Sequence, residues 1–283
     1  MGNRRSERAW IAAALALAAS PALALALGLW DPYWRAVTNL GDEPAYIALS
    51  ILLYALHSPD LGFHALLALA TSGWLSVLLK NALALPRPPR ELWKVEASGY
   101  GFPSGHAQTS AAFWSAVALG LRSAGLAAFG AVLVALVSYS RLELMVHYPR
   151  DVVGGAALGL ASALAVSKAL GAWRGWSPRA KSASLAAYGA AVSLLYLVQG
   201  DLMHVRLGGV LLGLSAYPLV RPRLPERAPP PARALSAAAA LALAVALTRA
   251  ASPLGPPLQL AAYAAATASV LAAPLALKAA KLI

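Results

Sequence analysis

Three short polar clusters separate long apolar segments in this chain of 283 residues. In chain order they are Lys80 with Arg87-Pro88, then Pro103-Ser104-Gly105-His106, then Ser140-Arg141 with His147 and Asp151. Lysine offers phosphate a point charge, whereas the guanidinium fork of arginine matches two phosphate oxygens at once. Imidazole transfers protons or attacks as a nucleophile. Together these residue types fit the transfer of a phosphoryl group.

The second and third clusters each stand where an apolar helix is expected to begin. Ser104 and Gly105 would occupy a helix N-terminus, whose free N–H groups and positive dipole end favour an anion. Glycine also lets the backbone approach a phosphate closely. Pro149 suits a first helical turn and places Asp151 near that N-terminus, where a carboxylate is favoured. Asp151 could therefore hold one ring nitrogen of His147 and raise the basicity of the other.

Each cluster also has an interpretation without chemistry. Lys80 alone would be a lysine snorkelling to the membrane interface, and Pro-Ser-Gly alone would be a turn. His147 and Asp151 could form a structural hydrogen bond or supply two metal ligands. Taken together at one face of a membrane, however, the three clusters favour an active site.

The composition predicts helices that span a membrane. Hydrophobic residues make up 59% of the chain and charged residues 12%, whereas about a quarter of a soluble domain is charged. About ten spans are expected, because lipid leaves the backbone of such segments no alternative to helix. They are 9–30, 43–57, 61–85, 105–121, 125–139, 152–170, 185–198, 207–220, 235–248 and 258–277. The predicted fold is an all-α polytopic bundle with helices three to six as its catalytic core.

The charge pattern predicts the orientation of the chain. Residues 9–30 are interpreted as a retained first helix rather than a signal peptide, because no polar cleavage region follows them. With the N-terminus in the cytoplasm, most Lys and Arg outside the three clusters fall in cytoplasmic loops, which places the clusters on the outer side. The net charge of +12 does not indicate nucleic acid, because the basic residues are scattered. The absence of cysteine excludes disulfides and Cys-based metal sites.

The motifs K-x6-RP, PSGH and SR-x5-H-x3-D resemble the three-part signature of the type-2 phosphatidic acid phosphatase superfamily. The flanking text LGDEPAYIAL, SGWLSVLLK, GYGFPSGHAQ and HYPRDVVGG is similar to a membrane branch of that family. The resemblance covers about residues 40–160. We therefore expect a phosphatase core at 1–170 and additional helices of unassigned role at 171–283, with a Pro/Arg-rich cytosolic linker at 221–234. The pairs Gly155-x3-Gly159 and Gly209-x3-Gly213 would permit close helix approach.

The resemblance also implies a role for each motif residue. His147 would attack phosphorus and become phosphohistidine, oriented by Asp151, and His106 would protonate the leaving group. Phosphate oxygens would be held by the remaining members, namely Lys80, Arg87, Arg141, Ser104 and Gly105. Neither a metal nor another cofactor is expected, because the cations replace it.

The expected substrate is a lipid phosphate or diphosphate, with membrane lipids as the surroundings and the oligomeric state open. A sugar phosphatase similar to glucose-6-phosphatase and a lipid phosphotransferase remain alternatives within the same chemistry. A transporter or a lipid-binding protein is the alternative from another class. Arg90, Lys94 and Glu96 could contact an incoming headgroup, and Glu143 could tune Arg141.

Overall fold

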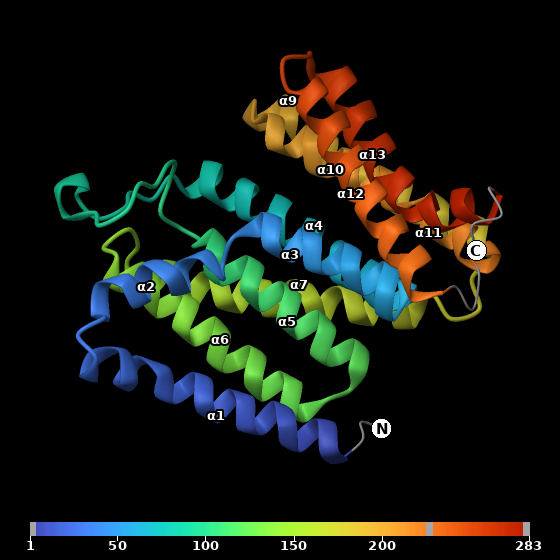
Figure 1. Ribbon diagram of the computed structural model, residues 1–283. Coiled ribbons are helices and arrows are strands. Elements are labelled where there is room, and N and C mark those ends of the chain that lie inside the picture. Colours follow the sequence, from blue (N-terminus) through green and yellow to red (C-terminus); the bar gives the residue numbers. More distant parts are fainter. Residues whose placement is uncertain (1–3, 225–228, 280–283) are drawn as a thin grey trace. The chain divides into compact units, whose positions relative to one another are not determined.

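The computed structural model describes residues 4–224 and 229–279, which form helices and short connections without a strand (Figure 1). The first half contains α1 (Arg4–Ala26), α2 (Trp30–Asn39), α3 (Glu43–Leu52), the π-turn η1 (Leu53–His57), α4 (Pro59–Leu83), the 3-10 turn η2 (Arg90–Leu92), α5 (Gly105–Leu121) and α6 (Ala124–Glu143). The second half contains α7 (Pro149–Ala172), α8 (Pro178–Leu194), α9 (Tyr196–Gln199), α10 (Leu202–Leu214), α11 (Tyr217–Val220), η3 (Arg221–Arg223), α12 (Pro230–Ala251) and α13 (Pro256–Ala279). Positions 225–228 of the predicted linker lie outside the described residues.

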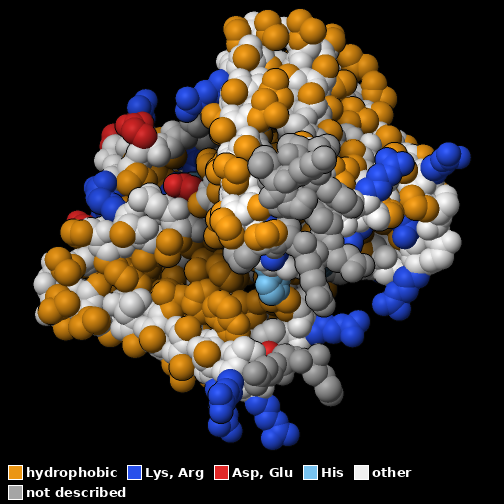
Figure 2. Space-filling view, turned by 45° about the vertical axis from the view of Figure 1, so that its right-hand side comes forward, with side chains coloured by type: hydrophobic (Ala, Val, Ile, Leu, Met, Phe, Trp, Pro, Cys, Tyr) orange, Lys and Arg blue, Asp and Glu red, His pale blue; other side chains and the backbone are white. Residues whose placement is uncertain are grey.

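Most of these helices have the length and composition of membrane spans. Within the described part of the chain, 8 helical segments are long and apolar enough to cross a membrane. The other two predicted spans coincide with α3 plus η1 and with α5, which has 17 residues. Figure 2 shows a surface dominated by hydrophobic side chains, as expected for helices that face lipid. The all-α polytopic fold is confirmed, whereas the count of ten spans stays a prediction.

The chain divides into two compact units, each made from two stretches of sequence. The first unit consists of the described residues of Met1–Ile47 and Thr71–Lys168, and the second of those of Ala48–Ala70 and Ala169–Ile283. The boundary after Ile47 falls inside α3, and the boundary after Ala70 falls inside α4. Residues 48–70 thus group with the C-terminal helices, while the functional division at residue 170 remains a prediction.

In the first unit, α6 packs against α1, α2 and α5, and α1, α6 and α5 run nearly parallel in Figure 1. Helix α7 joins this bundle through its predicted glycine pair. A Cβ on Gly155 would lie 2.6 Å from the Ser104 carbonyl oxygen, and one on Gly159 would lie 2.2 Å from that of Gln108. Because no side chain fits there, α7 lies directly against the start of α5. This contact positions the second motif against the third.

An alanine at position 159 is therefore expected to lower the melting temperature of the purified protein. The added methyl group meets backbone at 2.2 Å, and overpacking of this kind costs about 1–3 kcal/mol. Gly171, on the same helix, is the matched control, because a Cβ there meets nothing within 4 Å. G171A should be neutral or slightly stabilising, since alanine is the better helix former. Equal melting temperatures for G159A and G171A would contradict this packing.

Glycines also allow two helices to pack closely in the second unit. On α10, a Cβ at Gly209 would lie 2.7 Å from the Leu260 carbonyl oxygen of α13, and one at Gly213 would lie 2.5 Å from that of Ala264. Both predicted glycine pairs thus mark close helix contacts. At one end of this unit Arg221 contacts both carboxylate oxygens of Asp60, with nitrogen–oxygen distances of 3.0 and 2.9 Å.

Candidate active site

The three predicted clusters lie at helix ends within the first unit. Lys80 is in the last turn of α4, Ser104 is the N-cap residue of α5, and Arg141 is in the last turn of α6. Helix α7 begins at Pro149, as predicted, and carries Asp151 in its first turn. The connection between α6 and α7 holds His147 outside the helices. Each cluster thus stands at the beginning or end of a rigid element.

His147 is held from both sides of its ring. Its Nδ1 lies 3.3 Å from Oδ2 of Asp151, and its Nε2 lies 2.8 Å from Nη1 of Arg87. Because guanidinium only donates hydrogen bonds, Nε2 must be the acceptor and Nδ1–H must point to the carboxylate. The arrangement therefore fixes the tautomer that presents a lone pair on Nε2, as a nucleophilic imidazole requires.

The Asp151 carboxylate is fixed in turn by the start of α7. Its Oδ2 accepts a hydrogen bond from the backbone N–H of Tyr148 at 2.9 Å. The backbone carbonyl oxygen of Asp151 accepts another from the backbone N–H of Ser104, also at 2.9 Å. The side chain of Asp151 has no exposed surface, and that of His147 is 2% exposed. Burial lowers the pKa of His147 to about 4, although the hydrogen bond with Asp151 acts in the opposite direction. His147 is therefore neutral near pH 7.

Lys80 and Arg141 are the two further cations of the candidate site. Lys80 donates from Nζ to the carbonyl oxygen of Tyr100 at 2.9 Å, and Arg141 donates from Nη1 to Oγ1 of Thr38 at 2.6 Å. Nε of Arg141 and Oγ of Ser104 are buried without a hydrogen-bond partner. Unpaired buried polar atoms are costly, and both would be satisfied by an anion bound among these residues.

The predicted anion cradle at the start of α5 has free space in front of it. A Cβ on Gly105 would have no atom within 4 Å, so this turn opens onto the site. The Ser104 side chain makes no capping hydrogen bond within its own helix. The N–H groups at this helix end are thus accessible to an anion, in the position that favours one.

His106 has a carboxylate partner that was not predicted. Its Nε2 lies 3.0 Å from Oδ1 of Asp42, in the connection between α2 and α3. The neighbouring Gly41 abuts the same histidine, since a Cβ there would lie 3.0 Å from the His106 ring and 2.6 Å from Val137. His106 and His147 therefore form two separate pairs with aspartate.

The loop between α4 and α5 is fixed largely by Arg87. Beyond its contact with His147, this guanidinium donates to the carbonyl oxygens of Ser98, Gly99 and Val146 at 2.8, 3.0 and 2.9 Å. Arg87 thus ties the loop to the connection that carries the nucleophile candidate. Lys80, Arg87, Arg141 and His147 all act electrostatically on His106. These residues therefore form one positively charged cluster, which we call the cationic pocket.

Other charged residues of this region are engaged elsewhere. Lys94 pairs with Asp31 and Glu143 at 3.2 and 3.0 Å, and Arg90 pairs with Glu96 at 3.2 Å on the exposed surface. Glu143 also accepts from Nε1 of Trp30, so its proposed role in tuning Arg141 has no contact to support it. Lys94 thus ties the loop to α2 and α6, while Arg90 and Glu96 pair with each other within the loop.

The donor set in the pocket is poor in metal ligands. Among the residues that the structure describes, no group of three or more His, Asp or Glu side chains could hold a metal ion. Interpreting His147 and Asp151 as metal ligands therefore lacks a third ligand. The cationic residues instead suit an anion.

A family of known proteins matches the part of the chain that contains this site. Residues 61–174 match the model of the PAP2 superfamily, and all eight predicted site residues lie in that stretch. This part of the chain belongs to the PAP2 superfamily. The PAP2 region thus contains the end of every helix that supplies a motif residue.

Two relatives were found beyond the family match. Lipid A 1-phosphatase of Rhizobium etli is 31% identical over 150 residues, which are 44% of this chain and 64% of that protein. The chain therefore aligns with less than two thirds of this relative. The crystal structure of a transmembrane PAP2-type phosphatidylglycerolphosphate phosphatase from Bacillus subtilis matches 59% of this chain and 86% of its own, with 25% identity and a TM-score of 0.43.

The residues that sequence analysis missed lie outside the PAP2 region. Thr38 lies in the last turn of α2 and contacts Arg141, whereas Gly41 and Asp42 lie in the connection between α2 and α3 and contact His106. Two signals were available in the sequence. One is the polar stretch Thr-Asn-Leu-Gly-Asp beside an apolar segment, and the other is the flanking text LGDEPAYIAL, which contains Gly41 and Asp42. The PAP2 region is thus completed by a segment about 20 residues before it.

Proposed function

We propose that this chain is a membrane phosphatase that cleaves a lipid phosphate or diphosphate through a phosphohistidine at His147. The main support for this proposal is the hydrogen-bonded triad of Asp151, His147 and Arg87. The further cations Lys80 and Arg141 act electrostatically on the same histidine. This arrangement combines a neutral imidazole that has its lone pair on Nε2 with cations for the oxygens of a phosphoryl group. Membership of the PAP2 superfamily and the lipid phosphatase among the relatives support the same chemistry.

In the first step, Nε2 of His147 attacks phosphorus and the bond to the leaving oxygen breaks. Arg87 contacts Nε2 of His147, and its guanidinium would transfer to a phosphate oxygen as the substrate enters. Lys80, Arg141 and the N-terminus of α5 would bind the equatorial oxygens and stabilise the charge that develops on them. Asp151 would stabilise the imidazole as it becomes positively charged.

His106 supplies the proton for the leaving oxygen. Burial and the neighbouring cations disfavour a charged His106 in the free protein, so the ring would become protonated once a bound phosphate dianion offsets those cations. Because Nε2 faces Asp42, the protonated ring would then donate from Nδ1 and keep its Nε2–H on the carboxylate. The neutral ring would then accept a proton from the water that attacks the phosphohistidine. Both steps are general acid–base chemistry by one side chain. Inorganic phosphate leaves, and His147 and His106 return to their starting states.

The location at helix ends favours an amphiphilic substrate. A pocket at the membrane surface receives a phosphorylated headgroup while the hydrocarbon remains among the helices. The distribution of basic residues in the loops favours an N-terminus in the cytoplasm and a pocket on the outer side. The substrate would therefore be a lipid phosphate of the outer leaflet, with sugar phosphates as the alternative within the same chemistry.

The pKa of His147 gives a direct check of its environment. Burial lowers that pKa to about 4, so the ring should lose its proton near pH 4 rather than near 6.5. The nucleophile is then neutral and competent at every pH above about 4. NMR titration of histidine-labelled free protein should show this, and D151N should lower the pKa further, since the carboxylate raises it. A titration of His147 near 6.5 would contradict the buried arrangement.

Phosphate release from a panel of substrates tests the function itself. The panel should contain phosphatidic acid, a polyprenyl diphosphate, phosphatidylglycerol phosphate and glucose 6-phosphate, presented to the protein in proteoliposomes with a chelator. We expect release from at least one lipid, competition by vanadate, and little release from the sugar phosphate. Release from the sugar phosphate alone would overturn the lipid assignment, and release from none would overturn the phosphatase.

A further inference from the structure

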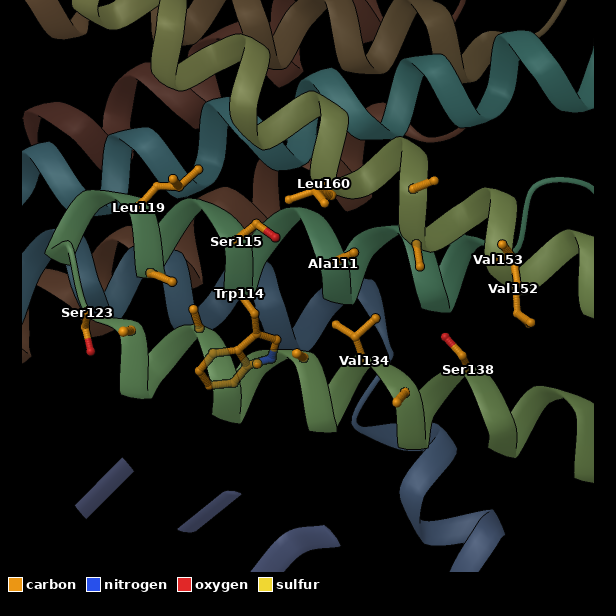
Figure 3. Close-up of a pocket in the computed structure, with 18 of the residues that line it drawn as sticks. Ala111, Trp114, Ser115, Leu119, Ser123, Val134, Ser138, Val152, Val153 and Leu160 are labelled. Atoms are coloured by element: carbon orange, nitrogen blue, oxygen red, sulfur yellow. The ribbon is translucent and has the colours of Figure 1, made fainter. Parts of the chain in front are cut away.

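A long apolar groove lies along three helices of the first unit. It is formed by α5, α6 and α7, and its volume is about 810 Å³. Figure 3 shows Ser123 and Leu119 at one end and Ser138 and Val152 at the other, with the Trp114 ring between α5 and α6. Of the residues that line the groove, only Arg122 is charged, and it lies at the first of these ends. The groove therefore suits an uncharged chain.

The far end of the groove is distant from the candidate site, and the near end adjoins it. Ser138 is one turn before Arg141 on α6, and Val152 directly follows Asp151 on α7. A headgroup bound in the cationic pocket would thus have the mouth of the groove within about one helical turn, roughly 5 Å. The groove continues from the place where a lipid's phosphate ends and its hydrocarbon begins.

The length of the groove also fits a hydrocarbon chain. On α6 the lining residues run from Ala124 to Ser138, which corresponds to about 21 Å at 1.5 Å per residue. One leaflet of a bilayer is about 15 Å of hydrocarbon, half of the roughly 30 Å core. A chain that fills the groove would therefore be at least as long as an ordinary acyl chain.

The wall of the groove on α6 is made of small side chains. Ala127, Ala131 and Ala135 line it at intervals of four residues, so they lie on one face of the helix. All three are exposed in the structure. Gly130 allows α6 to pack closely against α5, because a Cβ there would lie 2.7 Å from the Cβ of Trp114. These alanines mark successive depths, each about 6 Å further from the site.

We propose that this groove binds one hydrocarbon chain of the phosphorylated substrate and limits its length by depth. The proposal rests on the proposed lipid phosphatase function and names the part of the molecule that selects among lipids. A chain lying in the groove buries apolar surface against α5, α6 and α7, at a gain that grows with each methylene. A second chain of the same lipid would remain in the bilayer.

A series of tryptophans at the three depths tests this proposal. A135W, A131W and A127W should each be assayed with a homologous series of lipid phosphates whose chains increase from about six to about twenty carbons. Tryptophan at 135 should raise the KM of medium and long chains, at 131 that of long chains, and at 127 that of the longest chains alone. We expect increases of about tenfold or more once the chain meets the ring, equivalent to about 1.4 kcal/mol.

The matched control is A128W, on the same helix and equally exposed but outside the groove. It should leave the chain-length profile of the wild type unchanged. The shortest substrate should be hydrolysed normally by all four variants, because the catalytic residues are untouched. Profiles that shift equally at all three depths, or not at all, would overturn the groove assignment and indicate that ordinary membrane lipid occupies it. Failure of the wild type on every lipid would instead refute the proposed function.

Discussion

Replacing His147 by glutamine is expected to reduce kcat/KM at least about 10⁴-fold, because it removes the atom that bonds to phosphorus. Glutamine retains polarity and some of the size of imidazole, so the fold should persist. Both contacts of the ring, with Asp151 and with Arg87, belong to this one reactive arrangement. The measurement is phosphate release from the best lipid of the panel, in detergent and with chelator present.

H57Q provides the control for this variant, since His57 is an exposed histidine at the end of η1 in the second unit. It should retain the wild-type rate. Melting temperatures of both variants should lie close to that of the parent, which separates loss of chemistry from loss of fold. A rate for H147Q within about tenfold of the parent would refute the assignment of the nucleophile.

The second large effect is expected for H106Q and depends on the leaving group. General acid catalysis contributes about 10²–10⁴-fold, so kcat/KM for a lipid phosphate should fall by that factor. A substrate such as p-nitrophenyl phosphate releases a stable anion that needs no proton. Its kcat/KM, which reports formation of the phosphoenzyme, should fall less than about tenfold. An equal loss for both substrates would show that His106 does not protonate the leaving group.

D42N should reproduce the same pattern at smaller amplitude. Asp42 contacts His106 and not the phosphate site directly, so it acts as a positioning residue. We expect a loss of about 10–100-fold for the lipid phosphate, by analogy with partners that orient histidines at metal sites, and almost none for p-nitrophenyl phosphate. D31N is the control, because Asp31 pairs with Lys94 away from the pocket. A uniform loss with both substrates would indicate a merely structural role for Asp42.

The sequence predicted the ends of helices well where chemistry and helix signals coincide. Ser104 and Gly105 precede an apolar run, and Pro149 suits the first turn of a helix, so the second and third clusters were predicted at helix N-termini, where the structure has them. The spacing of four residues also indicated that Asp151 would reach His147. Local signals therefore predicted the row of residues around the nucleophile candidate.

Contacts between distant segments could not be predicted in the same way. Asp42 contacts His106 across 64 residues of sequence, and Thr38 contacts Arg141 across 103. Both contacts exist only because the segment from α2 to α3 folds back over α5 and α6. Lys94 looked available to a headgroup, yet it pairs with Asp31 and Glu143 once the loop is in place. No periodicity or spacing within a single segment contains this information.

The groove was likewise absent from the sequence analysis. Alanines at 127, 131 and 135 are ordinary in an apolar helix, and they line a cavity only because of the way α5, α6 and α7 pack together. The glycine pair on α7 was predicted to permit a close helix approach, but the partner helix was not. Packing between helices decides which small residues are covered and which remain open.

The most direct test of the central claim is to trap the covalent intermediate. The protein should be mixed with a lipid phosphate labelled with ³²P, quenched in alkali within milliseconds, and digested for peptide mapping. The structure predicts label that is stable in alkali and labile in acid, on the peptide that contains His147 and absent from H147Q. Substrate turnover without any labelled His147 peptide would contradict a phosphohistidine at this site.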